Sequence, residues 1–166
     1  TDRHLGELLD ELEARGLREE TIVVVTADHG EQFGEHSQYS HPHQLYEELI
    51  HVPLVVSGAD VSSQSWLGIT PVAGLTPWLV DKVGLDVPDS FVIDTLSAEH
   101  ESVTAEANLQ PDYVAAIRTD RWKYVRDERA EDALFNLETD PGEEENMLMD
   151  HPDVAEEFSN RLSEHL

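Results

Sequence analysis

Apolar residues in the first fifteen positions recur at the spacing of a helix. Four leucines share one stripe and face acidic residues across it: Leu5, Leu8, Leu9 and Leu12. This pattern predicts an amphipathic helix over residues 2–15, and Gly16 follows where a left-handed residue commonly ends a helix. The same reasoning predicts three further helices, over residues 44–50, 75–83 and 152–166.

Two short apolar runs in the first hundred residues read as strands. Residues 21–27 form an unbroken run rich in β-branched side chains, and residues 52–56 form another with Pro53 near its start. A run without alternation is typical of a strand covered on both faces, as in a parallel sheet. Helices alternating with such strands indicate an α/β fold with a parallel-type sheet.

The last third of the chain has a different pattern. Short segments with strand character follow one another, at residues 102–107, 113–118, 122–126 and 133–137. A tight turn at residues 119–121 separates two of them, which favours antiparallel pairing. We therefore expect two units: an α/β domain over residues 1–100, and a small antiparallel sheet with a closing helix over residues 101–166.

The charge balance excludes some classes of function. The 166 residues hold 10 basic and 36 acidic side chains, a net charge of −26, with Lys82 and Lys123 as the only lysines. No basic cluster exists that would bind nucleic acid. The acids spread through periodic segments, so we expect a folded protein with an acidic surface suited to high salt. The absence of cysteine excludes disulfides and thiolate metal sites within the chain.

Asp28 and His29 directly follow the first predicted strand, and Gly30 allows the backbone to turn sharply there. In open α/β sheets, ligands gather at the carboxyl ends of strands. A carboxylate beside an imidazole at such a position predicts two ligands of a metal site. The alternative is that Asp28 caps the next turn and His29 is a solvated loop residue.

Several motifs in order resemble the sulfatase branch of the alkaline phosphatase superfamily. They are Asp28-His-Gly-Glu31, Gly34-Glu-His36, Tyr46-Glu-Glu48, Val52-Pro-Leu54, Arg118-Thr-Asp-Arg-Trp-Lys-Tyr124, the stretch from Leu134 to Glu143, and Asn146. The resemblance is weakest over residues 57–112. It implies the C-terminal part of an alkaline phosphatase-like sandwich.

The resemblance also implies roles for individual residues. Asp28 and His29 match the two ligands that this half of the fold gives to a divalent cation, calcium or magnesium in most sulfatases. Because calcium prefers oxygen ligands, the imidazole of His29 leaves zinc and manganese as alternatives. His36 is expected to brace the loop behind the ligands.

His41 stands where many sulfatases have a lysine that contacts the sulfate and the leaving oxygen. A histidine there is able to neutralise the ester or protonate the leaving alkoxide. The exchange also keeps phosphate esters open as substrates. His43, by contrast, is expected to be peripheral, and Lys123 to form a structural salt bridge rather than to act in catalysis.

No Cys/Ser-X-Pro-X-Arg motif, the source of the formylglycine nucleophile, occurs in the sequence, and the paired aspartates that complete the metal site are missing too. We therefore expect this chain to be inactive alone and to have the N-terminal half of the same fold as its partner. An internal start is assumed, so localisation stays open. No run of about 20 apolar residues predicts a membrane span.

Three functions fit these observations. The first is the C-terminal part of a metal-dependent sulfatase acting on a small-molecule or glycan sulfate ester. The second is a phosphodiesterase or phosphoethanolamine-type transferase of the same superfamily. The third is a stand-alone remnant or binding module without catalysis.

Overall fold

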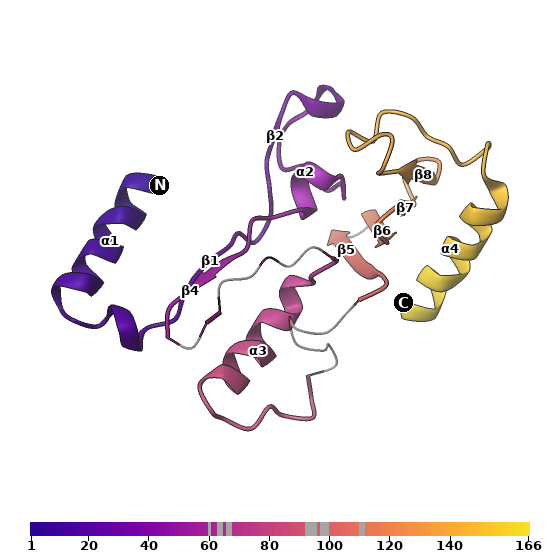
Figure 1. The fold of residues 1–166 in the computed structure, drawn as a ribbon. Coiled ribbons are helices and arrows are strands. Elements are labelled where there is room, and N and C mark those ends of the chain that lie inside the picture. The colour runs from indigo at the N-terminus through magenta and orange to yellow at the C-terminus, as the bar shows by residue number, and fades with distance from the viewer. Residues whose placement is uncertain (60, 63–64, 66–67, 92–95, 97–99, 110–111) are drawn as a thin grey trace.

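The computed structural model describes residues 1–59, 61–62, 65, 68–91, 96, 100–109 and 112–166 (Figure 1). The helices within these residues are α1 (Asp2–Ala14), α2 (Glu47–Ile50), α3 (Leu75–Lys82) and α4 (Pro152–His165). The strands are β1 (Val23–Val25), β2 (Gln32–Phe33), β3 (Tyr39–Ser40), β4 (Val55–Ser57), β5 (Val103–Leu109), β6 (Asp112–Arg118), β7 (Trp122–Asp127) and β8 (Ala133–Asn136). Short 3-10 turns lie between them at η1 (Arg18–Glu20), η2 (Glu35–Ser37) and η3 (Val72–Gly74).

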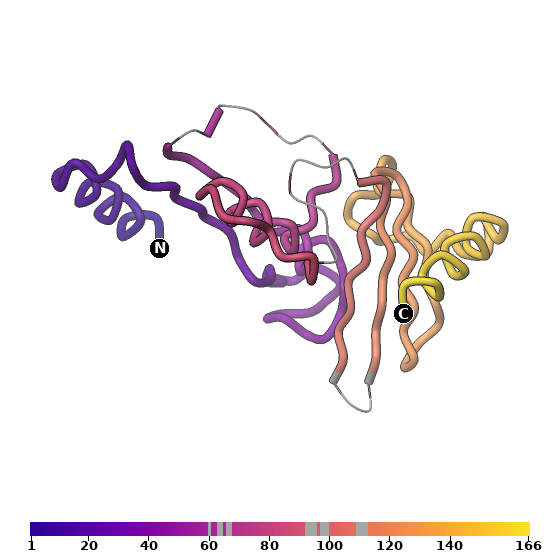
Figure 2. Tube along the Cα trace, turned by 90° about the horizontal axis from the view of Figure 1, so that it is seen from below, coloured from indigo at the N-terminus to yellow at the C-terminus, as the bar shows by residue number. Residues whose placement is uncertain are grey.

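The last four strands form an antiparallel sheet in the order β5-β6-β7-β8. Helix α4 covers one face of this sheet (Figure 2). Its residues Ala155, Phe158 and Leu162 pack with Ile117, Tyr124 and Leu134 of the strands in one buried cluster. The expected antiparallel sheet with a closing helix is therefore present, and it encloses a core of its own.

The opposite face of the sheet meets the first part of the chain. There Val114 and Ala116 form a buried cluster with Leu45, and Ile50 packs against it. Figure 2 shows the earlier elements on this side of the strands and α4 on the other. The segment around α2 is thus the part of the first region that rests on the sheet.

The expected parallel-type sheet was wrong for the strands that the structure describes. Strand β1 pairs with β4 in antiparallel register, from Val23 opposite Ser57 to Val25 opposite Val55. An unbroken apolar run indicates how well a strand is covered, but it does not indicate the direction of its neighbour. Here the chain leaves β1, passes through a loop and α2, and returns the opposite way. Residues Val23–Val25 are also only half-buried rather than covered on both faces.

Gly58 explains how closely the two strands approach. A Cβ at this position would lie 2.0 Å from the backbone oxygen of Thr21, and the residue has φ +129°. Only glycine fits both conditions. The chain therefore leaves the end of β4 in close contact with the backbone just before β1.

Helix α1 forms where the leucine stripe predicted it, but it buries no residue. Leu8 is 54% exposed. Figures 1 and 2 place α1 at the end of the molecule remote from α4. No helix among the described residues is long and apolar enough to cross a lipid bilayer.

The other elements follow the predictions with two differences. The helix expected over residues 44–50 is shortened to the single turn of α2, and the strand expected at 52–56 begins only at Val55. The hairpin of β2 and β3 was not predicted, because each strand has two residues and no periodicity is visible over so short a run.

Candidate metal site

The loop that follows β1 carries the predicted ligands and is held by its backbone against α2. The Gly30 N–H donates to the carbonyl oxygen of Leu49 at 2.8 Å. A Cβ at Gly30 would lie 1.9 Å from the backbone oxygen of Glu48. The glycine after the Asp-His pair therefore allows a close approach that no other residue permits.

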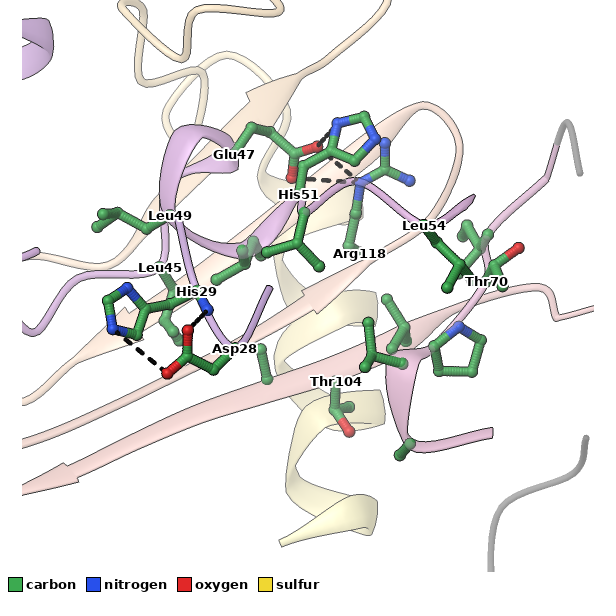
Figure 3. Close-up of a pocket in the computed structure, with 18 of the residues that line it drawn as sticks. Asp28, His29, Leu45, Glu47, Leu49, His51, Leu54, Thr70, Thr104 and Arg118 are labelled. Carbon is green, nitrogen blue, oxygen red and sulfur yellow. Dashed lines mark hydrogen bonds and ion pairs between the residues drawn. The ribbon is translucent and has the colours of Figure 1, made fainter. Parts of the chain in front are cut away.

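Asp28 and His29 present two unused ligand atoms to the same region (Figure 3). His29 Nδ1 lies 2.8 Å from the carbonyl oxygen of Gly30. Because a carbonyl only accepts, Nδ1 carries the hydrogen in this contact, and in the neutral ring Nε2 keeps its lone pair. Nε2 lies 3.9 Å from Asp28 Oδ2, while Asp28 Oδ1 accepts the His29 N–H at 3.0 Å. Oδ2 and Nε2 are thus close enough to bind one cation.

The Asp28 side chain is 91% exposed and anionic. Backbone hydrogen bonds from the N–H groups of Asp28 and His29 lower its pKa, and the charge interaction with His29 adds to this. A deprotonated carboxylate beside a neutral imidazole nitrogen is the form in which these groups bind a metal. Among the described residues, no three or more His, Asp or Glu side chains gather into a complete metal site.

His41 lies next to this pair although twelve residues separate it from His29. The two imidazole rings have their centroids 4.5 Å apart with an interplanar angle of 38°. His41 Nδ1 lies 3.4 Å from Glu31 Oε1 and 3.5 Å from Ser40 Oγ. The β2–β3 hairpin brings the end of the loop back to its beginning. Ser40, with φ +77°, turns the chain before His41.

His36 lies behind the loop rather than against the two ligands. Its ring stacks on Tyr46 with centroids 3.7 Å apart, and its Nε2 lies 3.5 Å from Glu48 Oε1. Glu48 Oε1 also accepts from the Gln32 Nε2 amide at 2.5 Å, and Gln32 is fully buried. His36 and Gln32 therefore attach the hairpin to the segment that leads into α2.

An open cleft of about 1510 Å³ runs from the Asp28–His29 pair along the sheet. His41, Thr104 of β5 and Arg118 of β6 are among its lining residues. Figure 3 shows Glu47 in the same cleft, joined to Arg118 and His51. The candidate ligands therefore lie at the wall of a space large enough for a substrate.

Comparison with known proteins gives a consistent result. The model of the sulfatase family matches residues 1–81. Arylsulfatase K of Bos taurus is 29% identical over 185 residues, which span 98% of this chain and 34% of the relative. The chain belongs to the sulfatase family. It spans about a third of the length of the curated sulfatases that it matches.

Other relatives extend this result along the whole chain. The Delta 4,5-hexuronate-2-O-sulfatase of Bacteroides thetaiotaomicron is 29% identical, covering 87% of this chain and 33% of that protein. A crystal structure of a putative sulfatase from the same species superposes with a TM-score of 0.88 at 23% identity, covering 98% of this chain and 39% of the other. The phosphonate monoester hydrolase of Agrobacterium radiobacter gives 0.82 at 22% identity, covering 99% and 39%. The fold is therefore a portion of the sulfatase fold.

Sequence reasoning missed one group of residues in this sulfatase chain. Glu47 and Glu48 belong to the Tyr-Glu-Glu motif and Glu143 ends a later motif, but no role was predicted for any of them. The salt bridge expected for Lys123 is present, and its partners are Glu47 and Glu143. The rarity of lysine in an acidic chain was the available signal.

Proposed function

We propose that this chain provides the second pair of metal ligands in an enzyme that hydrolyses sulfate esters. The observation that carries the proposal is the convergence of Asp28 Oδ2 and His29 Nε2, which lie 3.9 Å apart at the wall of the cleft. The anionic state of Asp28 and the lone pair on Nε2 suit a divalent cation. Two further ligands are needed, and we assign them to the part of the fold outside these 166 residues.

A divalent cation held there would neutralise the charge of the ester group and act as a Lewis acid. Calcium and magnesium prefer oxygen ligands, whereas zinc and manganese also bind imidazole readily. The imidazole of His29 therefore suits zinc or manganese better than calcium or magnesium. We keep calcium and magnesium first because the chain belongs to the sulfatase family, and the experiment below includes all four ions.

His41 is the residue of this chain that we assign to the substrate. Its Nδ1 lies 3.4 Å from Glu31 Oε1, so Nε2 is the nitrogen left to contact the ester or to give a proton to the leaving oxygen. The ring of His29 beside it, 4.5 Å between centroids, limits where the His41 ring lies. The formylglycine that attacks the sulfur is assigned to the rest of the fold, because the sequence here has no motif for it.

The relatives favour a sulfated glycan as substrate. One is named for its action on a hexuronate 2-O-sulfate, and a structure with a TM-score of 0.84 holds D-glucosamine-2-N,6-O-disulfate. A phosphate or phosphonate ester is the second candidate. It is favoured by His41 in place of lysine and by the likeness to the phosphonate monoester hydrolase.

The test is turnover by the full-length gene product with aryl sulfate and aryl phosphate esters. It is measured at high salt with calcium, magnesium, manganese and zinc added in turn. We expect Asp28→Ala to lower turnover by about 10³-fold, because losing a ligand removes several kcal/mol of stabilisation at the transition state. Asp10→Ala, another exposed aspartate, on α1, is the control and should leave turnover unchanged. Full activity of Asp28→Ala would contradict the metal assignment.

A further inference from the structure

A group of four charged side chains, two of them buried and two partly buried, joins the sheet to α2. We call it the ion cluster; its members are Glu47, Arg118, Lys123 and Glu143. The side chains of Lys123 and Glu143 are 0% exposed. A charge taken wholly out of water is costly unless it is paired, so a buried lysine in a chain with two lysines requires a reason.

The distances show that the ion cluster is centred on Glu47, the first residue of α2. Lys123 Nζ lies 2.7 Å from Glu143 Oε1 and donates to Glu47 Oε1 at 3.2 Å. Arg118 Nε lies 3.1 Å from Glu47 Oε2, and the Glu47 N–H donates to Glu143 Oε2 at 2.6 Å. Burial raises the pKa of Glu143, and the ammonium group of Lys123 opposes this rise. Two cations, Arg118 and Lys123, thus hold the side chain of Glu47, and one anion, Glu143, holds its backbone.

Helix α2 needs such an anchor because it has only four residues. A single helical turn is not stable by its own hydrogen bonds, since nucleation is unfavourable. Its position must come from tertiary contacts, and Glu47 makes them across 76 positions of sequence to Lys123 and 96 positions to Glu143.

The other contacts of α2 lead to the loop with the candidate ligands. Leu49 accepts the Gly30 N–H at 2.8 Å, one residue after His29. Glu48, beside Glu47 in sequence, holds the amide of Gln32 and lies 3.5 Å from His36. Adjacent glutamates therefore connect in two directions, Glu47 to the sheet and Glu48 to the hairpin.

We propose that Lys123, together with Glu143, is a positioning residue for the Asp28–His29 pair, acting through Glu47 and α2. This inference rests on the proposed function for the identity of the ligand, a metal ion. The chain of contacts from Lys123 to the loop does not depend on that identity. The chain of contacts is continuous from Lys123 to Gly30, which is the physical requirement for such coupling. Residues that orient metal ligands from behind commonly affect metal affinity by about 10–100-fold.

The experiment uses the full-length gene product stripped of metal and three variants. Lys123→Met removes the central cation, and Lys123→Met/Glu143→Gln removes one charge of each sign so that the buried group stays balanced. Glu143→Gln alone preserves side-chain shape and serves if the lysine variants fail to fold. Leu162→Ala is the control: it weakens the core on the opposite face of the sheet, a buried cluster that contains no residue of α2.

Two measurements are compared, backbone hydrogen exchange of residues 28–36 and calorimetric titration with Ca²⁺, Mg²⁺, Mn²⁺ and Zn²⁺ in turn. We expect the ion-cluster variants to lose exchange protection at Gly30 and Gln32 and to bind the ion about 10–100-fold more weakly. Leu162→Ala should change neither beyond its global loss of stability. Equal exchange of residues 28–36 in the ion-cluster variants and in Leu162→Ala would overturn the inference, whatever the titration gives. If the wild type binds none of the four ions, the proposed function fails, and the exchange comparison still decides the positioning role.

Discussion

The two ends of the molecule differ in how much of themselves they bury. In the sheet and α4, residues such as Ile117, Leu134 and Leu162 are 0% exposed. Helix α1 buries no residue, β1 is half-buried, and Val55 of β4 is 58% exposed. Yet the candidate ligands Asp28 and His29 follow β1, in the less buried region.

This difference separates the chemistry from the part that holds it in place. Exposed loops open locally at low free-energy cost, whereas cores open only with global unfolding. Two metal ligands on such a loop require a rigid support to hold their geometry. In this chain the support is the sheet of strands β5 to β8, and α2 connects it to the loop.

The largest expected effect comes from breaking that connection. Replacing Lys123 by methionine leaves the buried carboxylate of Glu143 without its cation, which should reduce the free energy of unfolding by about 3–5 kcal/mol. Lys82→Met is the matched control, because this other lysine lies exposed at the end of α3 with its Nζ 5.7 Å from the Trp78 ring centroid. It should cost about 1 kcal/mol or less.

Urea denaturation of both variants, followed by far-UV circular dichroism, measures the two losses. Equal losses for Lys123→Met and Lys82→Met would show that the ion cluster does not stabilise the fold. The connection between the two regions would then have to be sought in the apolar contacts of Leu45.

A second pair of variants tests the contrast in burial itself. Leu162→Ala removes a fully buried side chain between α4 and the sheet, and it should cost about 2–5 kcal/mol. Leu8→Ala removes a side chain of the same size that is 54% exposed on α1, and it should change stability by about 0.5 kcal/mol or less. The measurement is again urea denaturation of the 166-residue chain. A large loss for Leu8→Ala would indicate that α1 is packed in solution, for instance against a second copy.

The sequence predicted the elements of the well-buried sheet and α4 better than those of the less buried first region. Strands β6 and β7 carry their own signals, because both are rich in aromatic and β-branched residues and a tight turn joins them. The direction of β4 relative to β1 has no such local signal. It depends on the path of the 29 residues between Val25 and Val55, and that path is set by contacts distant in sequence.

The contacts of the candidate site also differ in how far the sequence predicts them. Asp28 and His29 are adjacent, so their pairing follows directly from the sequence. The approach of His41 to His29 depends on the hairpin, which in turn depends on unusual backbone angles at His36, Ser37 and Ser40. The contact of Glu47 with Glu143 joins residues 96 positions apart, and no periodicity or propensity indicates it.

Salt should affect the surface and the ion cluster differently. With a net charge of −26, carboxylates repel one another across the surface; two unit charges about 4 Å apart in water repel by about 1 kcal/mol. We therefore expect the melting temperature to rise as KCl increases from low to molar concentration. Because buried pairs are screened much less, the difference between wild type and Lys123→Met should stay constant. A melting temperature that falls with salt would contradict the prediction of a high-salt surface.

The smallest expected effect concerns a second contact between the regions. Arg129 binds both carboxylate oxygens of Asp127 at 2.8 Å and donates to the carbonyl oxygen of His43 at 2.7 Å, two residues after His41. The hydrogen bonds from Arg129 lower the pKa of Asp127. The charge of Asp127 therefore stabilises the fold above its unfolded-state pKa of about 3.9. This contribution is lost as the pH falls through the lower pKa of the folded state.

Asp127→Asn should accordingly reduce the free energy of unfolding by about 1 kcal/mol or less at pH 7, the usual range for a partly exposed pair. The difference from wild type should shrink toward zero as the pH falls below 4, because the wild-type carboxylate then loses its charge. Urea denaturation of both proteins at intervals between pH 3 and pH 7 gives the two curves. A difference that stays constant over this range would mean that the contribution of Asp127 comes from shape rather than from charge. In that case Arg129 would hold the segment after His41 without help from its ion pair.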